Sequence, residues 1–262
     1  FRGFKYSFFS FKSKNNFLAD QMITSILNSK DKKQLIEIHN RPYLVDQIAK
    51  KINNYPIILF LHNDPKTMKG SQSVLDRKNI LKKCEAVLCV SEYIKKQFLD
   101  GIKTKHKKVN VLYNGVSRKL KRFPKKKKEI LFVGRLVKEK GVELYIDAAE
   151  SILVDFPDWS FGLIGSTRLG SNNTNSYSLK LINKINKINY ISNQFKFYGF
   201  KDYNFVQEKM KNASIVAIPS LWQEPFGLVA AEAMSNGAAI IASKVGGIPE
   251  ILEDNGILIK NI

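Results

Sequence analysis

The feature of this sequence that most constrains its fold is the alternation of short apolar runs with amphipathic stretches along nearly the whole length. Most runs are four or five residues long and continuously apolar, which is typical of parallel strands covered on both faces. Strands that alternate with helices predict α/β units with right-handed crossovers. The predicted strands are Leu35–Ile38, Ile57–Leu61, Ala86–Val90, Val109–Tyr113, Ile130–Val133, Phe161–Ile164, Phe195–Tyr198, Ile215–Ile218, Ala239–Ala242 and Ile257–Ile259.

The clearest helical pattern follows the fifth predicted strand. Its apolar residues recur at spacings of three, four and seven, which places them on one face of an amphipathic helix. This face carries Val142, Tyr145, Ile146, Ala149, Ile152 and Leu153. We expect the helix to end before Pro157, which cannot continue it.

The number of strands predicts two domains, because ten strands exceed one compact open sheet of ordinary size. The turn signal Asn114-Gly115 precedes a charged stretch that contains proline. We therefore place the boundary near residues 115–128 and assign residues 1–117 and 118–262 to the two domains. The predicted fold class is α/β, with two facing, doubly wound and mostly parallel sheets. Ligands of such folds bind outside the carboxyl ends of the strands.

The composition is that of a folded globular protein rather than a disordered or membrane-spanning one. Hydrophobic residues make up 44% of the chain and charged residues 25%. No apolar run approaches the roughly 18–20 residues that a spanning helix needs. Cys84 and Cys89 lie in or beside the run Ala86–Val90, which predicts reduced, buried cysteines. No second Cys or His pair accompanies them to form a metal site.

The formal net charge of +20 leaves several interpretations open. Nucleic acid, an anionic membrane surface and an anionic small substrate are all compatible with it. So is a compositional bias toward Lys, Asn and Ile, of which residues 172–194 are typical. The most basic run, Arg118–Lys128, has no interleaved aromatic pattern, which disfavours single-stranded nucleic acid. It suits a solvated linker or a lipid-headgroup contact.

The segment Pro219–Met234 carries the strongest chemical signal. It predicts a loop after a strand, followed by a helix that begins near Phe226–Gly227. A helix start presents unpaired N–H groups and a partial positive charge, which suit a phosphate or sugar oxygens. Glu224 precedes the helix and Glu232 lies about two turns along it, so both can line one cleft. Either glutamate alone is also explained as a complement to the helix dipole.

A second segment, Phe132–Gly141, predicts a strand, a glycine turn and a helix start. Arg135 and Lys140 flank the turn and together can hold a diphosphate, Arg as a planar fork and Lys as a point charge. By itself this pattern is weak, because the chain contains 43 Lys and Arg residues.

Together these segments resemble the family 4 retaining glycosyltransferases, the group 1 glycosyl transferases, which have the GT-B fold of two Rossmann-like domains. The match includes two glutamates with seven residues between them, Pro-Phe-Gly after the first, the earlier Gly-Arg and Lys-Gly pairs, and the later segment Ala242–Ile251. The resemblance is firm from Ile130 to Ile259 and looser from Leu35 onward. It implies an incomplete acceptor-side domain in residues 1–117 and a nucleotide-sugar-binding domain in residues 118–262.

The resemblance implies a role for each matching residue. Arg135 and Lys140 neutralise the donor diphosphate as it leaves, Glu232 accepts hydrogen bonds from the ribose, and Glu224 lies by the donor sugar. His62 follows a predicted strand, and a histidine in that loop approaches the donor sugar in the family. The expected catalytic residues are thus Glu224, His62, Arg135 and Lys140. The expected donor contacts are Gly134, Arg135, Lys140, Gly199, Phe200, Glu224, Phe226, Gly227, Leu228 and Glu232, with Gly199 and Phe200 at the place for base contacts.

His39 stands at a strand end similar to that of His62, and packing and function are equally open for it.

The chemistry follows from the charge that develops. Breaking the anomeric C–O bond produces an oxocarbenium-like sugar and an anionic diphosphate, which preorganised positive groups stabilise. The chain contains no Asp-x-Asp to hold a divalent metal, so we expect metal-independent catalysis and no cofactor beyond the nucleotide sugar. Retention of configuration is implied by the resemblance. Front-face attack by the acceptor hydroxyl is the working hypothesis, because no second carboxylate is assignable as a nucleophile.

The chain also departs from the family. Nothing in Phe1–Asn16 matches the glycine-rich acceptor loop, and the helices that follow the segment equivalent to Gly256–Ile262 are missing, so we expect both ends to be truncated. Alternative hypotheses are a sugar-nucleotide epimerase, a non-catalytic sugar-nucleotide-binding module and, from charge alone, a nucleic-acid-binding protein. The preferred setting is cytoplasmic synthesis of lipopolysaccharide or another envelope polysaccharide. There the enzyme would act on a glycan or lipid-linked acceptor, in peripheral contact with the anionic inner membrane and without nucleic acid.

Overall fold

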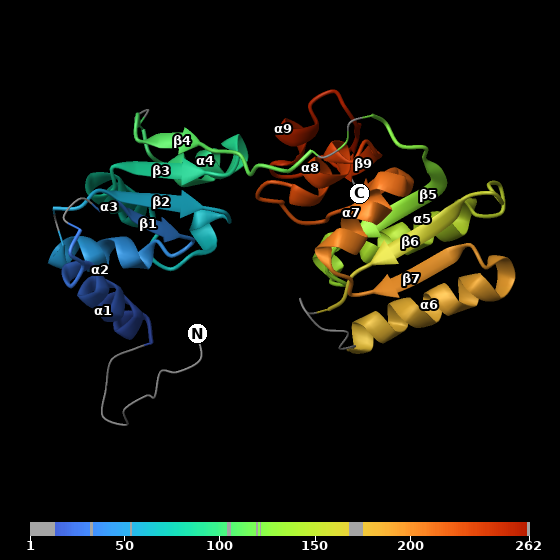
Figure 1. Cartoon of the computed structure of the whole chain (residues 1–262), viewed down its shortest axis with the longest axis horizontal. Coiled ribbons are helices and arrows are strands. Elements are labelled where there is room, and N and C mark those ends of the chain that lie inside the picture. Colours follow the sequence, from blue (N-terminus) through green and yellow to red (C-terminus); the bar gives the residue numbers. More distant parts are fainter. Residues whose placement is uncertain are drawn as a thin grey trace. The chain divides into compact units, whose positions relative to one another are not determined.

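The computed structural model describes residues 14–31, 34–52, 54–103, 106–118, 120, 122–167 and 175–260. The chain divides into two compact units, Phe1–Leu112 and Tyr113–Ile262, each with its own parallel sheet (Figure 1). The boundary predicted at residues 117 and 118 lies between the last strand of the first sheet and the first strand of the second. All ten predicted strands are present, and their bounds differ from the predicted ones by at most three residues.

The first unit contains a four-stranded parallel sheet with the order β1-β2-β3-β4. The strands are β1 (Ile36–His39), β2 (Ile57–Leu61), β3 (Ala86–Cys89) and β4 (Val109–Val111). The helices are α1 (Lys14–Leu27), α2 (Tyr43–Lys51), the 3-10 helix η1 (Pro65–Thr67), α3 (Val74–Lys83) and α4 (Glu92–Leu99). Ile38, Leu59 and Val87 are buried in three adjacent strands. The apolar runs therefore form the core, as the sequence predicts.

The second unit contains a six-stranded parallel sheet with the order β10-β9-β8-β5-β6-β7. Its strands are β5 (Lys127–Val133), β6 (Ser160–Ile164), β7 (Phe195–Gly199), β8 (Ala213–Ile218), β9 (Ala239–Ser243) and β10 (Ile257–Ile259). The chain runs outward from β5 to β7, crosses back, and runs outward again from β8 to β10. The carboxyl ends of β5 and β8 therefore meet where the strand order reverses. Ligands of open α/β sheets bind at this point.

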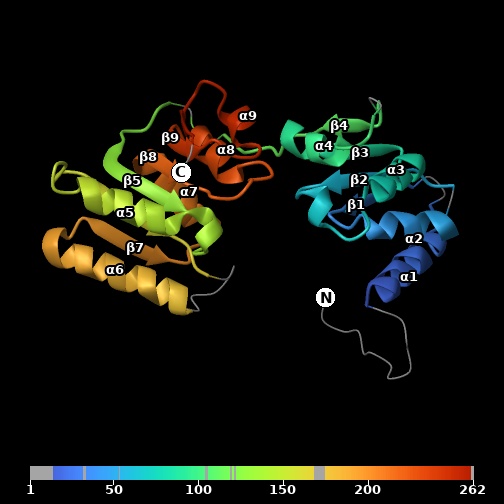
Figure 2. The same cartoon turned by 180° about the vertical axis from the view of Figure 1, so that it is seen from behind.

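Helices pack against both faces of the second sheet (Figure 2). The helices α5 (Val142–Ile152) and α6 (Ser176–Ser192) belong to one hydrophobic cluster. The helices α7 (Tyr203–Asn212), α8 (Leu228–Ser235) and α9 (Ile248–Leu252) belong to the other. Leu131 lies in the second cluster and its neighbour Phe132 in the first, because successive residues of a strand point to opposite faces. The short 3-10 helix η2 (Lys138–Lys140) precedes α5.

The helix expected after the fifth strand is confirmed as α5, which ends at Ile152, before Pro157. The long helix α6 was not predicted, because residues 172–194 were interpreted only as compositional bias. From Ser176 to Ser192 they form an amphipathic helix with Leu181, Ile185 and Ile188 buried. A capping box between Asn175 and Ser178 begins it, while residues 172–174 lie outside the described part.

The interpretation of Arg118–Lys128 as a solvated linker is wrong for its last three residues, whereas a lipid-headgroup contact stays a prediction. Lys127 and Lys128 begin β5. The ammonium of Lys126 donates hydrogen bonds to the carbonyl oxygens of three residues at the ends of α7 and α8, namely Met210, Lys211 and Asn236. Burial lowers the pKa of Lys126. Lys126 therefore belongs to the packed second unit, where a cation complements the C-termini of two helices, while the side chains of Lys127 and Lys128 are exposed. Lys119 and Lys121 lie outside the described residues.

Candidate functional site

The carboxyl edge of the second sheet is built from closely approaching backbone segments. A Cβ atom on Gly165 would lie 1.8 Å from the carbonyl oxygen of Gly134, and one on Gly141 would lie 1.8 Å from that of Pro219. Gly141 also has a φ of +66°, which disfavours other residues. The glycines thus bring the turn after β5 against the loops after β6 and β8.

A cavity of about 140 Å³ opens at this edge, at the reversal point between β5 and β8. Its walls come from the end of β5, η2, the end of β8, the following loop and the start of α8. The lining residues are Phe132, Val133, Gly134, Lys140, Ile218, Ser220, Glu224, Gly227, Leu228 and Val229. Both motif segments of the second domain therefore meet in one cavity. Five of the expected donor-contact residues line it: Gly134, Lys140, Glu224, Gly227 and Leu228.

The polar centre of this cavity is the carboxylate of Glu224, which is 7% exposed. Its Oε1 accepts a hydrogen bond from Nζ of Lys140 at 2.5 Å and another from Oγ of Ser220 at 2.6 Å. Lys140 also lies 5.3 Å from the ring centre of Trp222. A buried carboxylate requires such partners, because desolvation penalises an isolated charge.

The third motif segment, Ala242–Ile251, is hydrogen-bonded to the loop that carries Glu224. The amide of Gly247 donates to the carbonyl oxygen of Glu224 at 2.7 Å, and the amide of Gly246 donates to Oε1 of Gln223 at 2.8 Å. A Cβ atom on Gly246 would lie 2.0 Å from the Glu224 carbonyl oxygen. The paired glycines therefore support the loop through backbone contacts, a role that the sequence pattern did not indicate.

The helix α8 begins at this cavity. Gly227 is its N-cap at a φ of +104°, and no side chain caps it. Leu228 and Val229, in its first turn, line the cavity. The predicted helix start near Phe226–Gly227 is confirmed. Phe226 itself is buried, with its ring centre 6.1 Å from that of Tyr113.

Besides Phe226, four expected donor-contact residues do not line this cavity. Arg135 is exposed beside Gly134. Glu232 is partly buried on α8, and burial raises its pKa. Gly199 ends β7 at the same edge of the sheet, where its carbonyl oxygen accepts from the amide of Gly165 at 2.9 Å, and Phe200 follows it. Arg135 and Gly199 therefore lie at the carboxyl ends of β5 and β7, Glu232 lies along α8, and the roles of these residues stay predictions.

The two histidines of the first unit form a pair that the sequence did not predict. His39 ends β1, His62 follows β2, and Nδ1 of His39 lies 3.0 Å from Nε2 of His62. The two rings stack with their centres 5.3 Å apart, and the amide of His62 donates to Oδ1 of Asn40. Burial, and then the charge of His39, lower the pKa of His62. The parallel register of β1 and β2 brings the two strand ends together.

The residues missed by sequence reasoning are Ser220 and Trp222. Ser220 was detectable in principle, because it comes just after Pro219 and the end of β8 at the carboxyl edge, where site residues gather. The predicted burial of the cysteines is confirmed, and burial raises the pKa of both Cys84 and Cys89 to about 12. Among the described ranges, no group of three or more His, Cys, Asp or Glu is placed to hold a metal ion.

Comparison with known proteins gives the family. The model for Glycosyltransferase Family 4 matches residues 3–120, and the model for glycosyl transferases group 1 matches residues 116–261. An uncharacterized glycosyltransferase of Methanocaldococcus jannaschii is 33% identical over 218 residues, which are 82% of this chain and 57% of that protein. Spore coat protein SA of Bacillus subtilis is 28% identical over 255 residues, 88% of this chain and 66% of that protein. The chain thus spans 57% to 66% of the length of these relatives.

Solved structures agree on the fold. Anabaena HepE in complex with UDP superimposes with a TM-score of 0.74 at 22% identity, over 93% of this chain and 68% of that one. The sucrose-phosphate synthase of Thermosynechococcus elongatus gives a TM-score of 0.69 at 22% identity, over 94% and 66%. Because the family models cover nearly the whole chain and the fold is the two-domain α/β fold of GT-B enzymes, the chain belongs to the group 1 glycosyl transferases of glycosyltransferase family 4.

Proposed function

We propose that this protein transfers a sugar from a nucleoside-diphosphate sugar to a hydroxyl of a glycan or lipid-linked acceptor, and that the second unit binds the donor. The observation that carries this proposal is the cavity at the carboxyl edge, where the glycine turn with Lys140 meets the buried carboxylate of Glu224. A cation, a hydrogen-bond acceptor and a helix start there face one small space. These are the groups that a sugar joined to a diphosphate requires.

The proposed donor is a UDP-sugar in the first instance. HepE was solved with UDP and with UDP-glucose, and another structural neighbour is a UDP-forming trehalose-phosphate synthase. In the proposal, Lys140, Arg135 and the start of α8 receive the diphosphate. Glu224 accepts hydrogen bonds from the sugar hydroxyls, Glu232 accepts them from the ribose, and the loop at Gly199 contacts the base.

In the proposed reaction the anomeric C–O bond to phosphate breaks, and both of its electrons leave with the diphosphate. The acceptor oxygen forms the new bond on the same face of the sugar, and its proton passes to the departing diphosphate. Preorganised positive groups lower the barrier because they already point to where negative charge develops. Retention, front-face attack and independence from metal are parts of this proposal. His62 is proposed to approach the donor sugar from the first unit.

The proposed setting is the synthesis of an envelope polysaccharide at a membrane surface. One relative, 29% identical, is a Klebsiella pneumoniae protein from the cps region. The net charge of +20 favours an anionic surface. Among the residues that the structure describes, no helix is long and apolar enough to cross a membrane. Co-sedimentation with anionic vesicles at low salt tests this setting, and failure to bind would contradict it.

The experiment that tests the donor assignment is a thermal-shift panel of UDP-, GDP- and ADP-sugars, each with EDTA and with magnesium. A ligand that binds only the native state raises the melting temperature by mass action. We expect a shift with one nucleotide in EDTA that is lost in Lys140→Ala and Glu232→Ala. Lys187→Ala, an exposed lysine on α6, is the matched control and should keep the shift. The donor assignment fails if the folded wild type shifts with none of them.

A further inference from the structure

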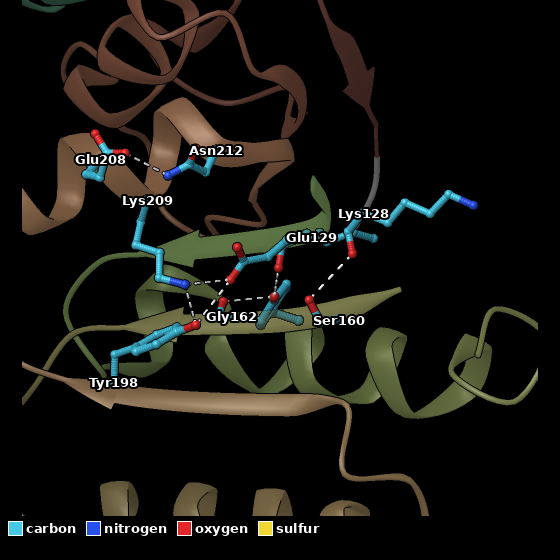
Figure 3. Close-up of polar contacts among 10 residues, drawn as sticks. Lys128, Glu129, Ser160, Gly162, Tyr198, Glu208, Lys209 and Asn212 are labelled. Carbon is cyan, nitrogen blue, oxygen red and sulfur yellow. Dashed lines mark hydrogen bonds and ion pairs between the residues drawn. The ribbon is translucent and has the colours of Figure 1, made fainter. Parts of the chain in front are cut away.

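A buried polar cluster joins β5, β7 and α7 in the second unit (Figure 3). Oε1 of Glu129 accepts a hydrogen bond from Nζ of Lys209 at 3.2 Å and another from the hydroxyl of Tyr198 at 3.3 Å. Lys209 also donates to the hydroxyl oxygen of Tyr198, and its ammonium lies 4.2 Å from the centre of that ring. One carboxylate thus connects three elements that are far apart in sequence.

The carboxylate of the cluster lies inside the fold, because Glu129 is only 3% exposed, while Tyr198 and Lys209 are partly buried. Burial opposes the charge of Lys209, but its bonds to Tyr198 and Glu129 outweigh this, so the pKa of Lys209 is raised. Burial also raises the pKa of Tyr198, which keeps its hydroxyl protonated as a donor. Gly162 lies on β6, between β5 and β7, and a Cβ atom on it would lie 2.8 Å from Oε1 of Glu129. The absence of a side chain at this glycine therefore leaves room for the carboxylate.

The cluster lies next to residues 199–202, which comprise the last residue of β7 and the loop that leads to α7. Tyr198 directly precedes these residues, and Lys209 lies in the last turn of α7. The ring of Tyr198 also meets Phe205 edge-on at 5.6 Å, and Lys201 lies over the ring of Phe205 at 5.2 Å. The strand β7 is at the edge of the sheet and pairs only with β6 among the described strands. We infer that side-chain contacts hold the end of β7 in place, where a second neighbouring strand would otherwise do so.

We propose that Glu129 is a positioning residue for the nucleobase subsite. Through Tyr198 it holds the strand end that directly precedes residues 199–202, and through Lys209 it ties this strand end to the last turn of α7, so that Gly199 and Phe200 meet the base of the donor in a fixed conformation. This inference rests on the proposed function. It requires that losing the cluster weakens binding of the nucleoside part of the ligand and leaves binding of the diphosphate part unchanged. The diphosphate depends instead on the turn after β5 and on the start of α8.

The test compares the affinities of UDP and inorganic pyrophosphate by calorimetry, on the full chain. Tyr198→Phe removes one hydroxyl and keeps the Glu129–Lys209 pair, while Glu129→Leu removes the carboxylate. Lys126→Met is the control for general destabilisation, because Lys126 binds backbone carbonyls in the last turn of α7, next to Lys209, rather than the carboxylate of Glu129. In the two cluster variants the Kd of UDP should rise about three- to tenfold, since each variant loses two hydrogen bonds of the cluster. The Kd of pyrophosphate should change less than about twofold, and in Lys126→Met both should change less than about twofold.

The outcomes separate the inference from the proposed function. The positioning role is overturned if Tyr198→Phe binds UDP as the wild type does, or if it loses affinity for UDP and pyrophosphate equally. In either case, binding of UDP by the wild type still supports the donor site. An equal loss of UDP affinity in Lys126→Met overturns it as well, since the effect would then reflect general destabilisation. If Glu129→Leu fails to fold, Tyr198→Phe decides alone. A wild type that binds no nucleoside diphosphate overturns the proposed function together with this inference.

Discussion

Replacing Lys140 with methionine tests whether its ammonium is what allows a carboxylate to lie buried at the cavity. The side chain of Glu224 is 9% exposed and that of Lys140 is 21% exposed, with 2.5 Å between the charged atoms. Methionine keeps the apolar stem and removes the charge. Removing one partner of a fully buried pair costs about 3–5 kcal/mol. Because Lys140 keeps some exposure and Ser220 still donates to Glu224, we expect a loss of about 2–3 kcal/mol in the free energy of unfolding.

The assay is urea unfolding followed by tryptophan fluorescence. The two tryptophans of the chain, Trp159 and Trp222, both lie in the second unit, so the signal reports on that unit alone. Glu224→Gln keeps the shape and the Ser220 bond, and we expect it to lose about 1 kcal/mol. The double variant should be more stable than the sum of the single losses predicts, by about 1.5–2 kcal/mol, because neither charge is then left unpaired. A loss below about 0.5 kcal/mol in Lys140→Met, or strictly additive losses in the double variant, would refute the reasoning.

Three further predictions concern packing and protonation elsewhere. Gly165→Ala should lower the free energy of unfolding of the second unit by about 3 kcal/mol or more, or abolish folding, since the added Cβ would overlap a backbone oxygen. Gly115→Ala is the control, because a Cβ there has nothing within 4 Å, and it should unfold at the same urea concentration as the wild type. Arg77→Met should lower the free energy of unfolding of the first unit by about 3 kcal/mol, because the buried guanidinium donates to three backbone carbonyls. Hydrogen exchange measures this change, and faster exchange confined to the ends of helices and strands would contradict the prediction. In an NMR titration His62 should titrate below its ordinary pKa, and His39→Asn should raise its pKa. Because the pKa of His62 is lower in the folded than in the unfolded state, the first unit should lose stability as the pH falls from the unfolded-state pKa to the folded-state pKa. An unfolding midpoint of the first unit that does not change over this pH range would contradict the assignment.

Much of the fold follows from local pattern. Runs such as Ile57–Leu61 are apolar at every position, and a run of this length is typical of a strand covered on both faces. The period of α5 is equally local, and Val142 and Ile146 are buried as that period requires. The helix α6 was missed because its Lys- and Asn-rich surface masked a narrow apolar stripe, in which Leu181 and Ile185 are one turn apart.

The candidate site divides in the same way. The Gly134–Lys140 turn and the Glu224 loop each follow an apolar run, so their place at the carboxyl ends of strands was readable from the sequence. Their convergence was not, because it depends on β5 and β8 being neighbours in the strand order. The same holds for the support that Gly247 gives to the Glu224 loop, which joins two strand ends across the sheet edge.

The sequence by itself determined the strands, the amphipathic helix α5 and the residue types that the two motifs bring to the site, since each depends on neighbours within a few positions of the chain. Only the tertiary structure decided which buried charges are partners. Glu224 meets Lys140 and Ser220, Glu129 meets Lys209 and Tyr198, and Lys126, in a run that appeared solvated, binds two helix ends. The physical reason is that a charge is tolerated in the interior only beside a complementary group, and the strand order brings that group near from a distant part of the chain.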